Sequence, residues 1–129
     1  MIRPYTPADF DAVRRLHARS GLPSVCMPQL DHPGFIVKRV VDSEEGVVQA
    51  GFLKTQAEAF LLLDHNYATA QKRWELLQDL TNFVISDGAK QGIECISAWI
   101  PPSVESSFGK RLLELGFTKS PWPCYSLLL

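Results

Sequence analysis

The stretch FIVKRVVDSEEGVVQAGFLK, residues 35–54, decides how the first half of the chain folds. It holds two runs rich in valine, isoleucine and phenylalanine, 35–42 and 47–54, separated by the polar segment 43–46. β-branched and aromatic residues favour strands, and a short polar segment that contains glycine favours a turn. The stretch therefore predicts a β-hairpin, and with it antiparallel pairing early in the chain.

Upstream of this hairpin, residues 6–9 (TPAD) have the composition of a helix start. Threonine can cap the first turn, proline fits the first helical position, and aspartate favours the positive end of the helix dipole. Apolar residues at helical spacing follow as far as Gly21, and residues 22–34 then contain three prolines. The sequence predicts a helix that ends before a proline-rich loop.

Downstream of the hairpin, strand-like and helix-like segments alternate. Residues 57–64 and 93–100 are apolar on both faces, which is typical of strands covered by helices. Between them, residues 69–87 carry a wide apolar stripe and predict the longest helix, which Gly88 is expected to end. This order of elements predicts a right-handed crossover and parallel strand pairing.

A last helix is expected to begin at residues 101–103 and to end at Gly116, with short extended pieces after it. Together the segments predict an α+β fold that forms a single domain, residues 1–129. Its central sheet is mixed, mostly antiparallel, and flanked by about three helices. Trp74 and Trp99 are expected among the core aromatic residues.

The composition argues against several functional classes. The net charge is −1, from 13 Lys and Arg against 14 Asp and Glu, so we expect neither nucleic acid nor a membrane surface as partner. No apolar run is long enough to span a membrane, and the N-terminal residues lack the apolar core of a signal peptide. Three scattered cysteines, without metal-binding spacing to the histidines, indicate reduced thiols, a cytoplasmic location and no metal site.

Several short motifs carry a family resemblance. They are IRPYTPADF at 2–10, GVVQAGF at 46–52, LGF at 115–117, and a strand-to-helix segment with Leu63, Asp64, Tyr67, Leu76 and Leu77. In this order and spacing they resemble the GNAT superfamily of N-acetyltransferases over nearly the whole chain. The resemblance implies the GNAT-like fold, a first strand at residues 1–5, and acyl transfer from acetyl-CoA or another acyl-CoA to an amine.

The resemblance also implies where the cofactor binds. The pantetheine arm is expected to pair with the backbone of the fourth strand, and the pyrophosphate to bind N–H groups at the start of the next helix. The residues implied are Leu61, Leu62, Leu63, Thr69, Ala70, Gln71, Lys72 and Arg73.

A general base is needed because the amine must lose a proton before it attacks the thioester. Glu58 and Glu94 lie on the predicted strands that flank the cleft, and His65 follows the fourth strand. These three residues are the candidates for a catalytic role, and an ordinary polar role at the surface is the alternative for each of them.

The chain departs from the family at three places, two of which concern the reaction itself. The family pattern Gln/Arg-x-x-Gly-x-Gly/Ala falls on Ala68, Gln71 and Arg73, so that long side chains replace both glycines. The position of the family's general-acid tyrosine holds Leu112, which cannot donate a proton. Lys72 and Arg73 could contact phosphate as charged donors instead, or they could belong to a solvated first turn.

Two hypotheses follow. The first is an acyl-CoA-dependent N-acyltransferase that acts on a small-molecule or peptide amine through an altered cofactor loop. The second is a catalytically inactive module of the same fold that has lost acyl-CoA binding and serves in binding or assembly. The third departure is the short proline-rich loop at residues 22–34, where the family often has a helix that shapes the acceptor site. The acceptor site is therefore expected either to be reduced or to be completed by a partner subunit in a homodimer.

Overall fold

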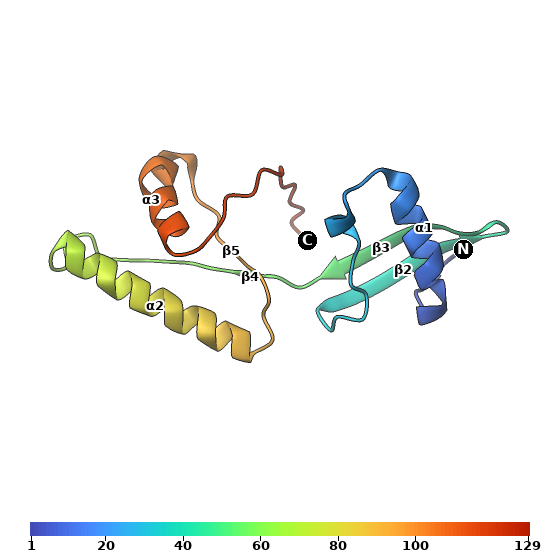
Figure 1. Ribbon diagram of the computed structural model, residues 1–129, viewed down its shortest axis with the longest axis horizontal. Helices are drawn as coiled ribbons and strands as arrows, with labels where there is room; N and C mark the ends of the chain where they lie inside the picture. The colour runs from blue at the N-terminus through green and yellow to red at the C-terminus, as the bar shows by residue number, and fades with distance from the viewer. The chain divides into compact units, whose positions relative to one another are not determined.

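The computed structural model describes all residues from 1 to 129 and has an α+β architecture (Figure 1). It contains a three-stranded antiparallel sheet, a two-stranded parallel sheet and three α-helices. By its contacts the chain divides into two compact units, Met1–Gln56 and Ala57–Leu129. The α+β class is confirmed, whereas the strands form two sheets and not the one mixed sheet expected. The single domain over the whole chain stays a prediction.

The first unit is built on the predicted hairpin. β2 (Phe35–Ser43) and β3 (Gly46–Lys54) pair antiparallel, and β1 (Ile2–Pro4) pairs with the other edge of β2. Gly46 adopts a φ of 94° at the turn, a left-handed conformation that glycine permits without steric cost. Both the hairpin and the first strand are confirmed.

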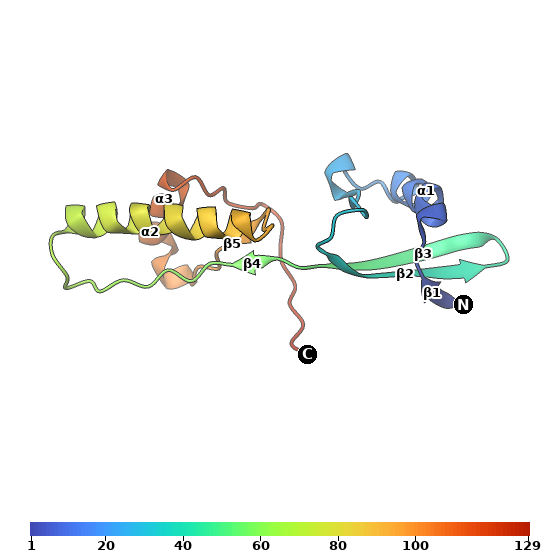
Figure 2. The same cartoon turned by 90° about the horizontal axis from the view of Figure 1, so that it is seen from below.

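Helix α1 covers one face of this sheet. α1 (Phe10–Ser20) follows a short 3-10 turn, Pro7–Asp9, and lies across the strands (Figures 1 and 2). Val13 of the helix and Val40 of β2 are both buried. Gly21, in the left-handed conformation, follows the helix as its C-terminal cap. The predicted start and end of this helix are therefore confirmed.

The guanidinium of Arg3 joins the separate elements of the first unit. Its Nη1 and Nη2 atoms each donate to Asp9 at 2.8 Å, and its Nε atom donates to Asp42 at 2.8 Å. Asp9 also accepts hydrogen bonds from the backbone N–H and the hydroxyl of Thr6. The hydrogen bonds from Arg3, and then that from the Thr6 backbone, hold the pKa of the Asp9 carboxyl well below its usual range. Arg3 therefore joins β1 to the 3-10 turn through Asp9 and to β2 through Asp42, and the Asp9 side of this network is buried, with Asp9 only 7% exposed.

The second unit has the predicted strand–helix–strand order. β4 (Ala57–Glu58) and β5 (Ile96–Ser97) pair in parallel, and α2 (Ala70–Lys90) lies between them in the chain. The parallel pairing expected from this order is confirmed.

The two strands of the second unit are shorter than the sequence predicts. Strands were expected over 57–64 and 93–100, but only two residues of each are paired. A strand that is apolar on both faces needs cover on both, and beyond the paired residues Phe60 and Leu62 are 77% and 88% exposed. The prediction of long, doubly covered strands is therefore wrong.

The helices of the second unit differ from the prediction at one end. α2 continues through Gly88, and the left-handed residue that follows the helix is Gly92, with a φ of 83°. α3 (Pro102–Glu114) begins where predicted, and Gly116 follows it with a φ of 95°. None of the three α-helices combines the length and the apolar character that a membrane crossing requires.

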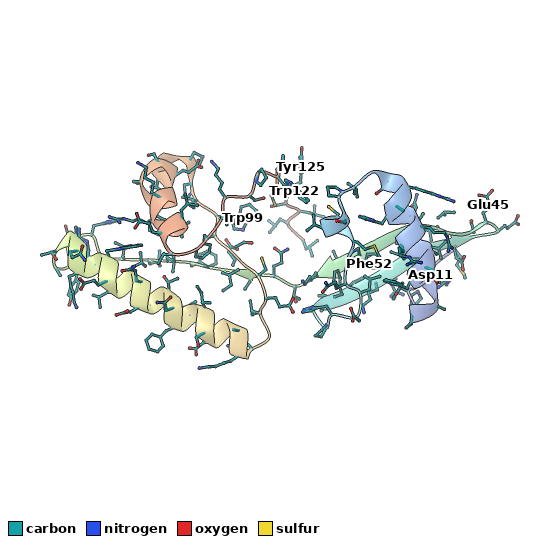
Figure 3. All side chains as sticks on the ribbon, in the orientation of Figure 1. Asp11, Glu45, Phe52, Trp99, Trp122 and Tyr125 are labelled. Atoms are coloured by element: carbon teal, nitrogen blue, oxygen red, sulfur yellow. The ribbon has the colours of Figure 1, made fainter.

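Few side chains of the second unit are fully buried. Leu77 of α2 and Leu112 of α3 are buried, and the Arg111 guanidinium lies 4.7 Å from the centroid of the half-buried Trp74 ring as a cation–π contact. Trp99 is 59% exposed, because it lies beyond the paired part of β5. Its prediction as a core aromatic residue is therefore wrong. Figure 3 labels Trp99, together with Trp122 and Tyr125 of the same unit.

Asp9→Asn is expected to destabilise the first unit because it removes the carboxylate that Arg3 and Thr6 bind. Hydrogen exchange at the amide of buried Val40 should become several-fold faster at neutral pH. A carboxyl with a lowered pKa stabilises the fold above its unfolded pKa, near 4, and loses that contribution as the pH falls further.

The difference in exchange between wild type and Asp9→Asn should therefore shrink below about pH 4. Asp11→Asn is the matched control, because Asp11 is exposed and pairs only with exposed Arg14. Equal exchange rates in Asp9→Asn and Asp11→Asn at neutral pH would contradict the stabilising role of Asp9.

Thr81→Val is expected to raise the free energy of unfolding of the second unit by about 1 kcal/mol. The Thr81 side chain on α2 is 3% exposed, and its buried hydroxyl makes no hydrogen bond. Valine keeps the shape and removes the unpaired group. The control, Thr81→Ser, keeps the hydroxyl and loses a methyl group, and should lower the free energy of unfolding by about 1 kcal/mol.

Urea unfolding followed by tryptophan fluorescence measures both variants, because all three tryptophans lie within 57–129. A loss of stability in Thr81→Val would mean that the hydroxyl has a partner in solution.

Candidate functional site

The candidate site lies where β4 leaves its partner strand and the chain turns into α2. Glu58 pairs with Ser97 as the last residue of the ladder, and the N–H of Ala59 donates to the Ser97 carbonyl at 2.8 Å. From there, residues 60–69 continue without regular secondary structure and run back along α2 (Figures 1 and 2). The backbone of this segment is therefore not part of either sheet.

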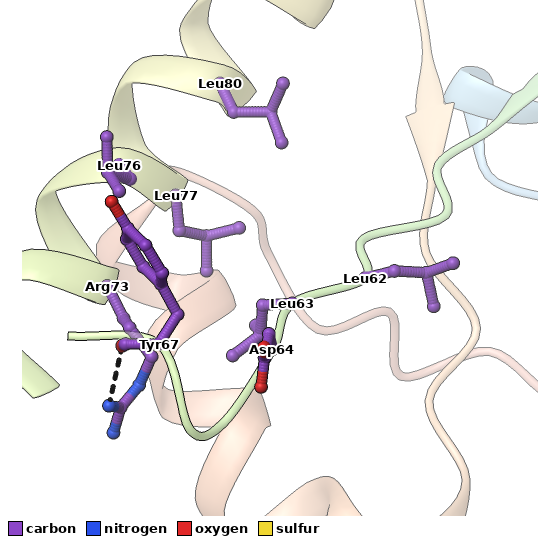
Figure 4. A pocket seen from close by; sticks show the side chains of 8 residues that line it. All are labelled: Leu62, Leu63, Asp64, Tyr67, Arg73, Leu76, Leu77 and Leu80. Atoms are coloured by element: carbon purple, nitrogen blue, oxygen red, sulfur yellow. Dashed lines mark hydrogen bonds between the residues drawn. The ribbon is translucent and has the colours of Figure 1, made fainter.

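A small apolar cavity of about 180 Å³ lies between this segment and the first half of α2 (Figure 4). Four of its lining residues come from the segment and four from the helix. They are Leu62, Leu63, Asp64 and Tyr67, and Arg73, Leu76, Leu77 and Leu80. Five leucines make the wall mostly apolar, while Asp64 and Arg73 add one charge of each sign. A cavity of roughly 150 Å³ with such a lining can hold a group the size of benzene.

The N-terminus of α2 adjoins this cavity. The Thr69 hydroxyl accepts a hydrogen bond from the N–H of Lys72 at 3.1 Å, so Thr69 caps the helix as its sequence position predicts. The N–H groups of Ala70 and Gln71 precede the first intrahelical hydrogen bonds and have no acceptor within the helix. Together with the helix dipole, they make this end electrostatically favourable for an anion.

Arg73 folds back over the turn that precedes α2. Its Nη1 atom donates to the carbonyls of Tyr67, at 3.1 Å, and Ala68, at 2.9 Å. Figure 4 shows Arg73 beside Tyr67, with the hydrogen bond between them drawn. Ala68 has a φ of 51°, a left-handed conformation that is costly for a residue with a Cβ atom. The Arg73 guanidinium therefore stabilises a strained turn at the edge of the cavity.

Gln71 and Lys72 both interact along the helix. The Gln71 amide donates to Glu75 at 3.1 Å, and the Lys72 ammonium lies 3.9 Å from the other Glu75 oxygen. All three side chains are exposed, so these contacts add little stability. This geometry is that of a solvated first turn, the alternative to direct phosphate contact.

The predicted cofactor residues are thus brought near one another only in part. Leu62, Leu63 and Arg73 line the cavity, and Thr69 and Ala70 form the helix start beside it. Leu61 lies on the same segment but does not line the cavity. Asp64, Tyr67, Leu76 and Leu77 belong to the strand-to-helix motif that carries the family resemblance, although they were not among the predicted cofactor-binding residues, and Leu80 was not linked to the site at all. The helical spacing of the three leucines was the available signal, because it places them on one side of α2.

The three candidate bases do not meet in the cavity. Glu58 lies at the end of the paired part of β4, His65 lies in an exposed turn within the segment at 60–69, and Glu94 precedes β5. None of them lines the cavity. Only Glu58 lies at the point where the ladder ends.

Two further observations bear on the chemistry of the site. Leu112, at the position where the GNAT resemblance would place a tyrosine, is 5% exposed and belongs to the core of its unit. No group of three or more histidine, cysteine or acidic side chains is arranged to hold a metal ion, and all three cysteines are free thiols.

The chain matches no family model, no curated protein and no solved structure.

Ala68→Gly is expected to leave the second unit equally stable or to stabilise it by up to about 1 kcal/mol, because glycine adopts the left-handed conformation without strain. The same substitution two residues later, Ala70→Gly, is the matched control. Ala70 is helical, so glycine there should lower the free energy of unfolding, by up to about 1 kcal/mol. Urea unfolding followed by tryptophan fluorescence compares the two. The left-handed turn would be contradicted if Ala68→Gly were the more destabilising variant.

Proposed function

We propose that the chain binds an acyl-CoA along residues 59–64 and at the start of α2, and that it is a GNAT-type N-acyltransferase. The observation that supports this most is the end of the β4–β5 ladder at Ala59, which leaves the following backbone outside a sheet, beside an apolar cavity and a helix N-terminus. The pantetheine arm of CoA is extended, contains amides and leads to phosphates. Such a ligand needs free backbone groups for its amides, an apolar wall beside its chain, and unpaired N–H groups for its phosphates.

In this proposal the phosphates bind the N–H groups of Ala70 and Gln71, and the pantetheine amides bind the backbone of residues 60–64. The thioester then lies near Glu58, at the end of the ladder. The Glu58 carboxylate accepts the proton of the acceptor amine, directly or through water, while the amine nitrogen forms a bond to the thioester carbon. The carbon–sulfur bond then breaks, and the CoA sulfur leaves as a thiolate that takes a proton from water.

The absence of a tyrosine at Leu112 does not forbid this reaction. A thiol has a pKa of about 8.5, so its thiolate is a far better leaving group near neutral pH than an alkoxide or an amide nitrogen. A general acid would accelerate the step without being required for it. The acceptor in the proposal is a small-molecule or peptide amine, and a homodimer that completes its site remains part of the proposal.

A catalytically inactive binding or assembly module of the same fold is the second candidate. The arrangement of Arg73 favours it, since the guanidinium is already committed to the Tyr67 and Ala68 carbonyls beside the helix start. Gln71 and Lys72 interact with Glu75 along the helix, and Leu112 fills the core. Binding of acyl-CoA separates the two candidates, because only the first requires it.

Wild-type protein is expected to bind acetyl-CoA in isothermal titration calorimetry, and Lys72→Gln to weaken that binding several-fold, because it removes an ammonium beside the proposed phosphate position. Lys90→Gln, at the opposite end of α2, is the matched control and should bind as wild type does. Pantetheine, which lacks the phosphates, should bind more weakly and be insensitive to Lys72→Gln. If acetyl-CoA and longer acyl-CoAs produced neither heat nor a shift in melting temperature, the acyltransferase proposal would fail and the module would be favoured.

Glu58→Gln is expected to slow acetylation of an amine acceptor by about 100-fold or more, since a positioned general base contributes that much. Its affinity for acetyl-CoA should stay unchanged, because the side chain contacts the acceptor and not the cofactor. Glu45→Gln, in the exposed turn of the β2–β3 hairpin (Figure 3), is the control. Release of free CoA thiol measures the rate, and equal rates for Glu58→Gln and Glu45→Gln would exclude Glu58 as the base.

A further inference from the structure

We draw no further inference here: the strongest candidate, the exposed apolar patch of Phe83 and Val84 on α2 beyond the cavity-lining leucines, carries no proposal because nothing in the structure shows what covers it.

Discussion

The parallel pairing of β4 with β5 is the constraint on which the candidate site depends. It consists of two residue pairs and is extended by the N–H of Ala59. Because the ladder stops there, residues 60–69 are not held by strand pairing and run along α2. That path places Leu62 and Leu63 opposite the leucines of the helix, and it brings the chain to the helix start at Thr69. A longer ladder would hold one edge of this backbone against β5 and keep it in the strand direction, away from α2.

Two kinds of group at the start of α2 attract electron-rich partners: the free backbone N–H groups and the Arg73 guanidinium. The N–H groups at the beginning of α2 favour an anion, whereas the Arg73 guanidinium is engaged by backbone carbonyls. Those carbonyls are uncharged, and a phosphate oxygen is a stronger partner for a guanidinium. The same side chain can therefore stabilise the turn in one state and an anion in another. The two proposed functions therefore differ in whether the Arg73 guanidinium keeps these carbonyls as its partners.

The sequence predicts well those elements that local patterns determine. The hairpin at 35–54 is present because alternating β-formers flank a turn with glycine, and α2 begins where Thr69 can cap it. The extent of β4 could not be predicted in the same way, because a strand that is apolar on both faces needs partners far away in sequence. The orientation of Arg73 could not be predicted either, because it depends on the directions of the carbonyls in a turn where Ala68 adopts a left-handed backbone conformation. The family resemblance indicated which part of the chain to consider for the candidate site, and tertiary contacts determined the geometry of that part.

The left-handed conformation of Ala68 also limits how this chain can vary in evolution. Glycine, asparagine and aspartate tolerate such a backbone, whereas valine, isoleucine and threonine do not, because a branched Cβ collides with the neighbouring carbonyl. Relatives that keep the turn should therefore show a narrow set of small or polar residues at this position, while the neighbouring exposed positions drift. The residue types found at position 68 in an alignment of relatives would then show whether the turn is shared or occurs in this chain alone.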